Sequence, residues 1–104
     1  MEAKTIFNGL KTLGIPTAHN VFVKPQKPPY IIYLDNGFQK ICANSKCILT
    51  KTKITVELYT KPETVNNYEE TVESYLDSFT TYEKNRAFDE KQGLYITYYN
   101  FYIH

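Results

Sequence analysis

The sequence has few of the residues that chemistry at a site requires. It contains no tryptophan, one arginine, two histidines, two cysteines and four glycines. Neither the P-loop pattern nor the dinucleotide-binding pattern, whose glycines cradle phosphates, is present. The longest uninterrupted apolar run, YIIYL at 30–34, is far shorter than the ~18 residues that a membrane span needs. We therefore expect no cofactor and no membrane partner.

The cysteines and histidines do not form a recognisable catalytic or metal-binding pattern. Cys42 and Cys47 have no second pair and no suitably spaced histidine beside them, so we expect no metal site. His19 and His104 lack a neighbouring nucleophile, and we expect no catalytic residue and no enzymatic activity. In a reducing cytoplasm both thiols would be free and packed as small apolar groups, with a reversible disulfide across a turn as the alternative.

Length and composition indicate a single domain spanning 1–104. The chain has 104 residues, of which 42% are hydrophobic and 22% charged, and these values are ordinary for one domain with one core. The first stretch, MEAKTIFNGLK, has an acid at its second position and no basic head followed by an apolar centre. It does not have the pattern of a secretion signal, so we expect the protein in the cytoplasm.

Charge is unevenly distributed, although the net charge is only +1. Between 20 and 61 seven lysines face two acids, a balance of +5, whereas from 62 onward eight acids face three bases, a balance of −5. Solvated surfaces would account for both regions. Opposite poles on one small domain would also favour head-to-tail self-association, so we expect a homo-oligomer.

A first helix is expected at 2–13, where apolar residues recur at spacings of three and four. Gly14 can adopt the left-handed conformation that ends a helix, and Ile15 can fold back onto the last turn. A short extended piece at 20–24 follows. The prolines of KPQKPP then form a semi-rigid connector that leads into a strand at 30–34.

The middle of the chain predicts a turn and another strand. Asn36 and Gly37 both accept positive φ, so a turn is expected directly after the first strand. The stretch ICANSKC that follows is expected to form a loop or an irregular hairpin arm. At 53–60, KITVELYT alternates apolar and polar residues, which predicts a strand buried on one face.

A second helix is expected at about 62–79. Thr60 to Glu63 has the form of a capping box, with a proline in the first turn, where its missing donor costs nothing. Apolar residues then recur at helical spacing. The acids are expected together on the solvent side of this helix: Glu69, Glu70, Glu73 and Asp77.

Two strands close the chain, a weak one at 81–88 and a strong one at 94–103. The order helix, strands, helix, strands, without a βαβ repeat, indicates an α+β fold. We expect a mainly antiparallel β-sheet of four to five strands with two α-helices packed on one face. The other face is then bare unless a partner covers it.

Ten tyrosines are the most unusual feature of the composition. Tyrosine suits surfaces that are buried only on assembly, because it combines a large contact area with a polar tip. In LYITYYNFYI both faces are apolar or aromatic, which a strand buried on one face does not need. Expecting Ile96 and Tyr98 in the core, we assign to an interface three aromatic residues and three lysines beside prolines or turns: Tyr95, Tyr99, Phe101, Lys24, Lys27 and Lys46.

A small nucleic-acid-binding α+β module is the alternative from another class. Four lysines, at 40, 46, 51 and 53, cluster near aromatic strands, and sheets with exposed aromatics can stack bases. A single arginine and a near-neutral charge argue against it, and tyrosine-rich strands are more common in cores and protein interfaces. We therefore expect no specific nucleic-acid binding.

The order of the pieces also resembles a known family. A first helix ending LKTLGIPTAH, then KPPYIIYL, an ANSK loop, ITVELYTK, an acidic helix and GLYITYYNFYI follow one another in the chain. This series resembles the small tail-terminator or head–tail joining (tail completion) proteins of long-tailed phages and prophages of Gram-positive bacteria, over nearly the whole chain.

The resemblance implies a structural, ring-forming subunit that caps the tail tube and docks to the head connector. Its partners would be further copies of itself, the tail tube protein and the head connector or stopper protein. It implies no cofactor and no turnover. The protein would occur in the bacterial host cytoplasm during assembly and at the head–tail junction of the virion.

Overall fold

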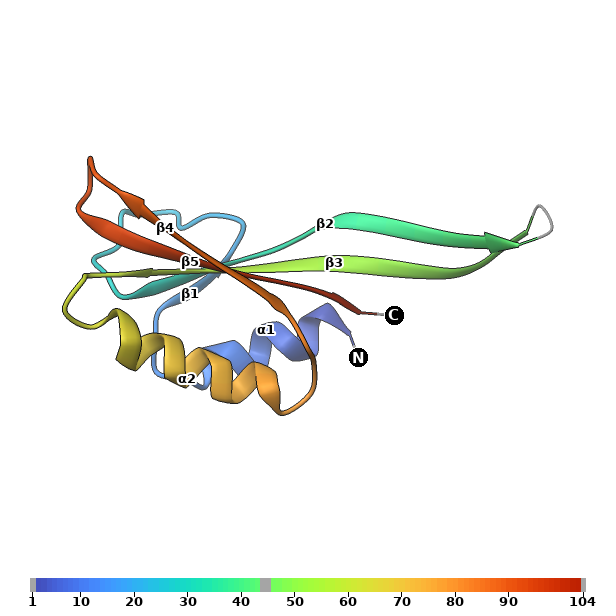
Figure 1. Cartoon of the computed structure of the whole chain (residues 1–104), viewed down its shortest axis with the longest axis horizontal. Helices are drawn as coiled ribbons and strands as arrows, with labels where there is room; N and C mark the ends of the chain where they lie inside the picture. Colours follow the sequence, from blue (N-terminus) through green and yellow to red (C-terminus); the bar gives the residue numbers. More distant parts are fainter. Residues whose placement is uncertain (1, 44–45, 104) are drawn as a thin grey trace.

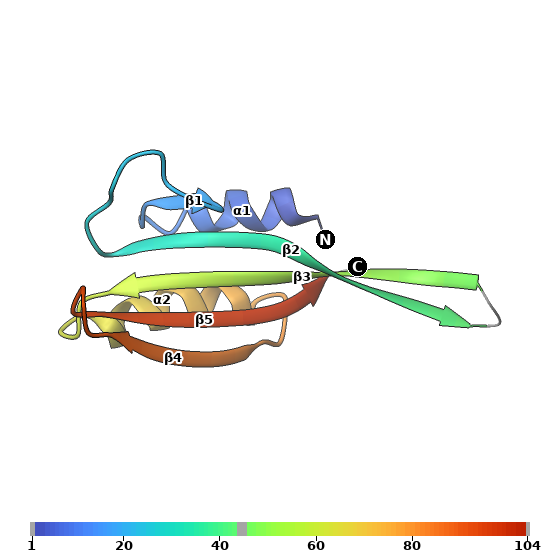
Figure 2. The same cartoon turned by 90° about the horizontal axis from the view of Figure 1, so that it is seen from above.

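Five strands form one sheet, and two helices lie against one of its faces (Figures 1 and 2). The computed structural model describes residues 2–43 and 46–103, apart from the side chains at 36, 38, 39, 41, 43 and 47–49. This arrangement confirms the expected α+β class. In chain order the elements are α1 (Ala3–Lys11), β1 (Thr17–His19), β2 (Tyr30–Ala43), β3 (Lys46–Thr60), α2 (Val65–Asp77), β4 (Glu83–Asp89) and β5 (Leu94–Ile103).

The strands lie in the order β1-β2-β3-β5-β4. β1 pairs with β2 in parallel, and the other three pairings are antiparallel. The first edge strand occupies 17–19, so the expectation of an extended piece at 20–24 is wrong. The amide of Ile31 donates to the Pro16 carbonyl, which places β1 beside β2 directly after the first helix.

Periodic apolar residues produce the core as expected. Ile6 and Leu10 of α1 are fully buried, and Gly14 has a φ of 79°, so the chain turns back and buries Ile15. On β3, alternate residues point under the helices. The buried cluster joins both helices to the three central strands: Ile6, Leu10, Ile15, Ile31, Tyr33, Ile54, Val56, Leu58, Val72, Leu76, Tyr99 and Phe101.

The turn expected at Asn36 and Gly37 is wrong, because β2 continues through both residues. Leu34 pairs with Thr55 and Gly37 with Lys53, so β2 carries one more residue than β3 between these pairs. The extra residue makes a β-bulge, which bends the strand without ending it. β2 and β3 stay paired as far as Ala43 and Lys46, and 44–45 lie outside the described residues.

The capping box expected at 60–63 is also wrong. Thr60 is the last residue of β3, and its buried hydroxyl has no hydrogen-bond partner in the described part of the chain. Helix α2 begins later, at Val65, after turn residues. Strand pairing with Tyr95 of β5 holds Thr60 extended, so its hydroxyl cannot reach the first turn of the helix.

The β2–β3 hairpin projects well beyond the rest of the molecule. Its outer part, residues 37–53, is called the arm below, and the remainder is called the body. The arm extends past the ends of both helices and makes the molecule long, with extents of 52 × 27 × 26 Å (Figures 1 and 2). Both termini lie near the base of the arm (Figure 1).

Candidate assembly surfaces

The aromatic residues assigned to an interface lie mainly in the core. Tyr99 pairs with Val56 and Phe101 with Ile54, and directly opposite residues of an antiparallel pair share one face. Tyr99 is therefore 0% exposed and Phe101 only 3% exposed, so their placement on the uncovered face is wrong. Tyr95 lies on the same helix-covered face as Tyr99 and Phe101, but it is half-buried at the edge of that face.

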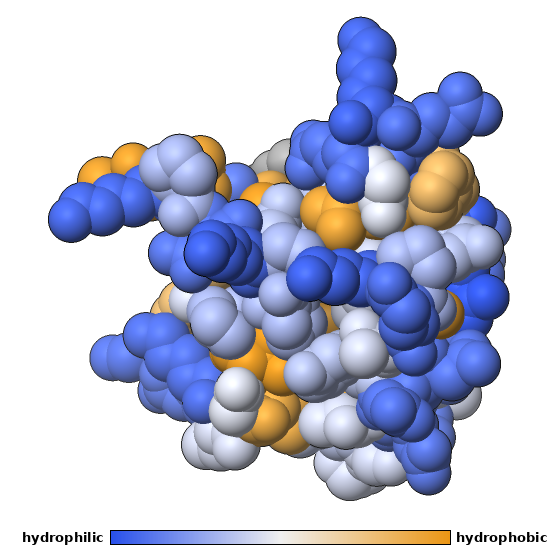
Figure 3. All heavy atoms as spheres, turned by 90° about the vertical axis from the view of Figure 1, so that its left-hand side faces the viewer, coloured by the Kyte–Doolittle hydropathy of each residue, from blue (hydrophilic) through white to orange (hydrophobic). Residues whose placement is uncertain are grey.

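The lysines assigned to the interface are exposed but separate from one another. Lys24 and Lys27 lie in the loop between β1 and β2, at the end of the body opposite the arm. That end presents mainly hydrophilic side chains around a few apolar ones (Figure 3). Lys46 is the first residue of β3, at the far end of the arm. The structure does not bring the predicted residues together into one site.

The sheet face opposite the helices is lined by half-exposed aromatic and aliphatic side chains. Tyr30 and Tyr59 stack with ring centroids 4.5 Å apart, and Phe22 of the preceding loop meets Tyr30 edge-on at 5.6 Å. The Tyr59 hydroxyl donates to Glu57 at 2.8 Å; burial and this hydrogen bond raise the pKa of Tyr59. We call this surface the open face; its apolar and aromatic residues are Tyr30, Ile32, Leu34, Tyr59, Ile96, Tyr98 and Tyr102.

The sequence predicted that all four acids of α2 lie on the solvent side, but one of them is buried. Glu69 is 3% exposed and lies between the helix and the sheet. It accepts hydrogen bonds from Thr97 at 2.6 Å, from Lys84 at 3.2 Å and from Arg86, whose Nε lies 2.9 Å from one carboxylate oxygen. A second Arg86 nitrogen contacts the other oxygen. The prediction of an outward Glu69 is wrong because β4 supplies two cations to it.

The electrostatics of this cluster follow from its contacts. Burial acts to raise the pKa of Glu69, but hydrogen bonds from Arg86, Thr97 and Lys84 outweigh burial and lower that pKa to about 2. Lys84 also contacts Glu73 at 2.8 Å, and the Tyr99 hydroxyl donates to the same carboxylate. Burial and this hydrogen bond raise the pKa of Tyr99. The cluster therefore attaches α2 to β4 and β5.

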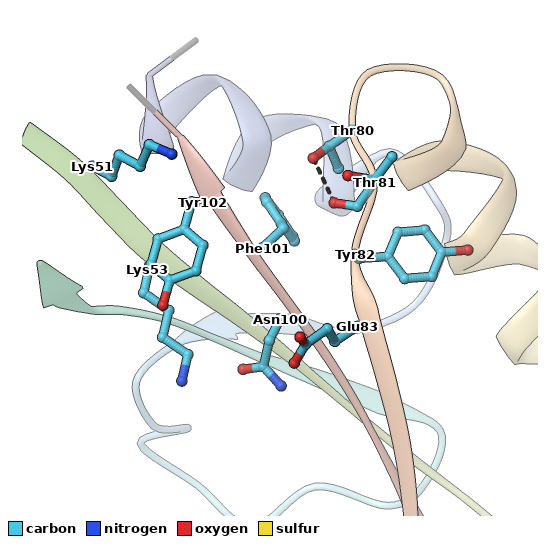
Figure 4. A pocket seen from close by; sticks show the side chains of 9 residues that line it. All are labelled: Lys51, Lys53, Thr80, Thr81, Tyr82, Glu83, Asn100, Phe101 and Tyr102. Atoms are coloured by element: carbon cyan, nitrogen blue, oxygen red, sulfur yellow. Dashed lines mark hydrogen bonds between the residues drawn. The ribbon is translucent and has the colours of Figure 1, made fainter. Parts of the chain in front are cut away.

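A hollow of about 480 Å³ lies at the base of the arm (Figure 4). Residues of β3, of β5 and of the connection from α2 to β4 form its walls. Lys53 projects into this region because its stem crosses Gly37, where a Cβ would lie 2.7 Å from the Cβ of Lys53. Ammonium, hydroxyl and amide groups surround the hollow together with the Glu83 carboxylate; the lining is Lys51, Lys53, Thr80, Thr81, Tyr82, Glu83, Asn100, Phe101 and Tyr102.

His19 is hydrogen-bonded to Asp35 where the arm leaves the body. Its Nε2 lies 2.8 Å from a carboxylate oxygen of Asp35, which is part of the bulge in β2. The rings of Phe7 and Tyr33 lie 6.0 and 5.2 Å from the imidazole. This contact holds β1 against the first residues of β2 beyond the core. It is a structural contact and does not pair a nucleophile with a base.

The two cysteines lie opposite each other in the register of the arm. Cys42 is exposed and disulfide-bonded, so the expectation of a free, packed thiol is wrong for this residue. The side chain of Cys47 and its expected packing as a small apolar group lie outside the described residues.

The described residues, 2–43 and 46–103, include neither a candidate metal site nor a membrane-spanning helix. They hold no group of three or more His, Cys, Asp or Glu side chains placed to bind a metal ion. No helix in them is both long and apolar enough to cross a membrane. Comparisons with protein-family models, curated proteins and solved structures found no match. The case for function therefore rests on this chain's own surfaces.

Proposed function

We propose that this protein is a structural subunit that assembles into a ring at the head–tail junction of a long-tailed phage or prophage. In this role it caps the tail tube and docks to the head connector, as a tail terminator or a head–tail joining protein. It acts without turnover and without a cofactor. The order of motifs in the sequence supports the phage assignment, and the surfaces of the fold support the assembly role.

The observation that carries the assembly role is the open face. Stacked tyrosines and aliphatic side chains lie half-exposed there across three neighbouring strands, whereas the helices cover the other face. Contiguous apolar surface of this kind marks interaction sites in soluble proteins. Tyrosine is enriched in such interfaces because its ring is buried while its hydroxyl can still bind water or a polar partner.

Charge and sheet edges support contacts between copies. Helix α2 carries four acids and no base, whereas the arm carries four lysines and no acid. Surfaces of opposite charge on one chain favour heterologous contacts between copies, and contacts of this kind can close into rings. Strand β4 is an exposed edge of the sheet. A neighbouring subunit would pair with the backbone of this edge, which otherwise invites aggregation, and such pairing does not require the side chains of β4.

Two matched substitutions test the open face. Tyr102, on the open face, and Phe88, on the helix side of β4, are each 48% exposed. We expect light scattering of purified protein at high concentration to show a multi-subunit species. Tyr102→Ala should weaken this association about tenfold, the loss of one well-packed aromatic contact, whereas Phe88→Ala should leave it unchanged. Equal effects, or a strict monomer also in the presence of tail tubes, would contradict the proposal.

Electron microscopy of tails made with and without the protein tests the place of assembly. Tails of uncontrolled length in its absence would identify a terminator. Tails of normal length that fail to join heads would identify a connector. Normal, head-joined particles in its absence would refute a role at the head–tail junction, whatever the protein's oligomeric state.

A further inference from the structure

The arm is a strongly basic projection on an otherwise acidic protein. It carries Lys40, Lys46, Lys51 and Lys53 without any aspartate or glutamate. Because the whole chain has a net charge of +1, the rest of the chain carries −3. The first two lysines are exposed and the other two half-exposed. Within the described residues, the ion pairs join Lys84 and Arg86 to acids of α2, and none involves a lysine of the arm.

The lysines occupy both faces of the arm, which is a two-stranded ribbon except at its base, where Thr52 and Lys53 also pair with β5. Lys40 pairs directly with Thr50, so these two side chains share one face. Successive residues of a strand alternate, so Lys51 and Lys53 lie on the opposite face. A flat partner, such as the acidic side of α2 on another copy, would meet only one face. A concave polyanion would neutralise both faces at once.

We propose that the arm binds duplex DNA by entering the major groove. That groove admits a two-stranded β-ribbon, and rows of phosphates border it on both sides. Lysine acts on phosphate as a point charge and does not read bases by bidentate contacts. The only arginine, Arg86, is held by Glu69 in the body. Binding is therefore independent of sequence, and the acidic body keeps the contact confined to the arm.

This proposal does not rest on ring formation, and its test uses the full chain at a concentration where light scattering shows monomer. Fluorescence anisotropy of a labelled duplex of roughly 20 bp, about two helical turns, measures binding as salt is varied. Four neutralised phosphates give a slope of log K against log salt of about −3.6, so affinity should fall about a hundredfold between roughly 50 and 200 mM salt.

Charge-neutralised variants locate the contact. The triple variant Lys40→Gln, Lys46→Gln, Lys51→Gln should bind at least about tenfold more weakly and reduce the slope to about −1, because each lysine on a phosphate contributes about one unit. Lys53 stays in place because its stem packs over Gly37. The control makes the same charge change at the opposite end of the body: Lys24→Gln, Lys27→Gln, Lys91→Gln. Its affinity and slope should stay near those of the unchanged protein.

The outcomes separate the two kinds of partner. Wild-type protein that binds no duplex at low salt refutes the proposal, as does binding that only the control triple weakens. If wild type binds no DNA but the arm triple abolishes salt-sensitive self-association, the arm instead meets the acidic surface of a second copy. Thermal unfolding should show equal midpoints for both triples, which excludes loss of fold as the cause.

Discussion

Gly9 of α1 allows the two helices to approach each other closely. A Cβ at this position would lie 2.0 Å from the hydroxyl oxygen of Tyr75 on α2. The same hydroxyl donates to the Ile6 carbonyl at 3.1 Å. From the sequence, a glycine inside a short helix only weakens it. The structure shows the compensation, because the missing side chain makes room for the tyrosine ring.

Gly9→Ala should therefore destabilise the protein, although alanine favours helix by about 1 kcal/mol over glycine. The methyl group displaces the Tyr75 ring, and overpacking of this kind costs about 1–3 kcal/mol. Chemical denaturation measures the change. Asn8→Ala is the control, since Asn8 is exposed on the same helix and should tolerate the change. A Gly9→Ala protein more stable than wild type would show that the helices separate without cost.

At the scale of elements, the Glu69 cluster decides how the last strands are held. β4 is an exposed edge strand, and Lys84 and Arg86 connect it to α2 through this carboxylate. The pKa of Glu69 lies at about 2 in the folded protein, below its ordinary value of 4.5. A lowered carboxyl pKa stabilises the fold fully above pH 4.5, and this stabilisation is lost as pH falls toward 2.

Glu69→Gln should remove this pH dependence. The amide keeps the shape of the side chain but leaves Arg86 without a charged partner and Lys84 with Glu73 alone, at a cost of about 3 kcal/mol near neutral pH. Denaturation midpoints at several pH values should show a steep acid loss in wild type between about pH 4.5 and 2. That loss should be shallow in Glu69→Gln and unchanged in Glu70→Gln, whose side chain is exposed. Parallel curves for all three proteins would contradict the assignment.

Local periodicity predicted some elements and failed at others for identifiable reasons. Strand 53–60 and both helices followed from alternation and helical spacing. In β5, the polar residue Thr97 lies on the buried face, so the opposite face looked more apolar and was taken for the core. The Thr97 hydroxyl donates a hydrogen bond to Glu69. Glu69 itself stands four residues after Val65 and three before Val72, a spacing that fits the buried side, although we placed it on the solvent side with the other acids of this helix. The cations that neutralise its buried carboxylate come from β4, later in the chain, so the helix sequence alone does not reveal them.

The uneven charge of the sequence did locate a real surface, although the candidate site was predicted poorly. The basic region includes the arm, but the sequence placed a turn where β2 continues, so the arm's length was missed. Asn36 and Gly37 accept positive φ, yet pairing of the following residues with β3 extends the strand and leaves only a bulge there. Long-range pairing of this kind leaves no local signal.

At the scale of the whole molecule, the arm and the body have different roles. The described core residues all lie outside the arm; on β3 they begin with Ile54. Replacing 38–52 with an Asn-Gly turn, which suits a tight hairpin, should change the unfolding free energy by less than about 1 kcal/mol, because the removed strand pair adds nothing to the described core and a hairpin alone is at best marginally stable. Chemical denaturation checks this, and a loss of cooperative unfolding would show that the arm supports the body.

The same shortened protein should lose DNA binding while it keeps the open face. Anisotropy with the labelled duplex and light scattering at high concentration measure the two properties on one sample. The Lys24, Lys27 and Lys91 triple again serves as the control for charge. Retained DNA binding after removal of the arm would place the contact on the body.

The bulged hairpin has a mechanical consequence. The strands of the arm are the same strands that cross the core, and β3 is hydrogen-bonded to β2 on one side and to β5 on the other. These bonds run perpendicular to the strands. A pull along the arm therefore loads many of them together in shear, whereas a sideways push acts first at the bulge beside Asp35. The molecule therefore resists tension along its long axis and bends more easily where the pairing of β2 with β3 is irregular, between Leu34 and Gly37 and between Ile41 and Cys42.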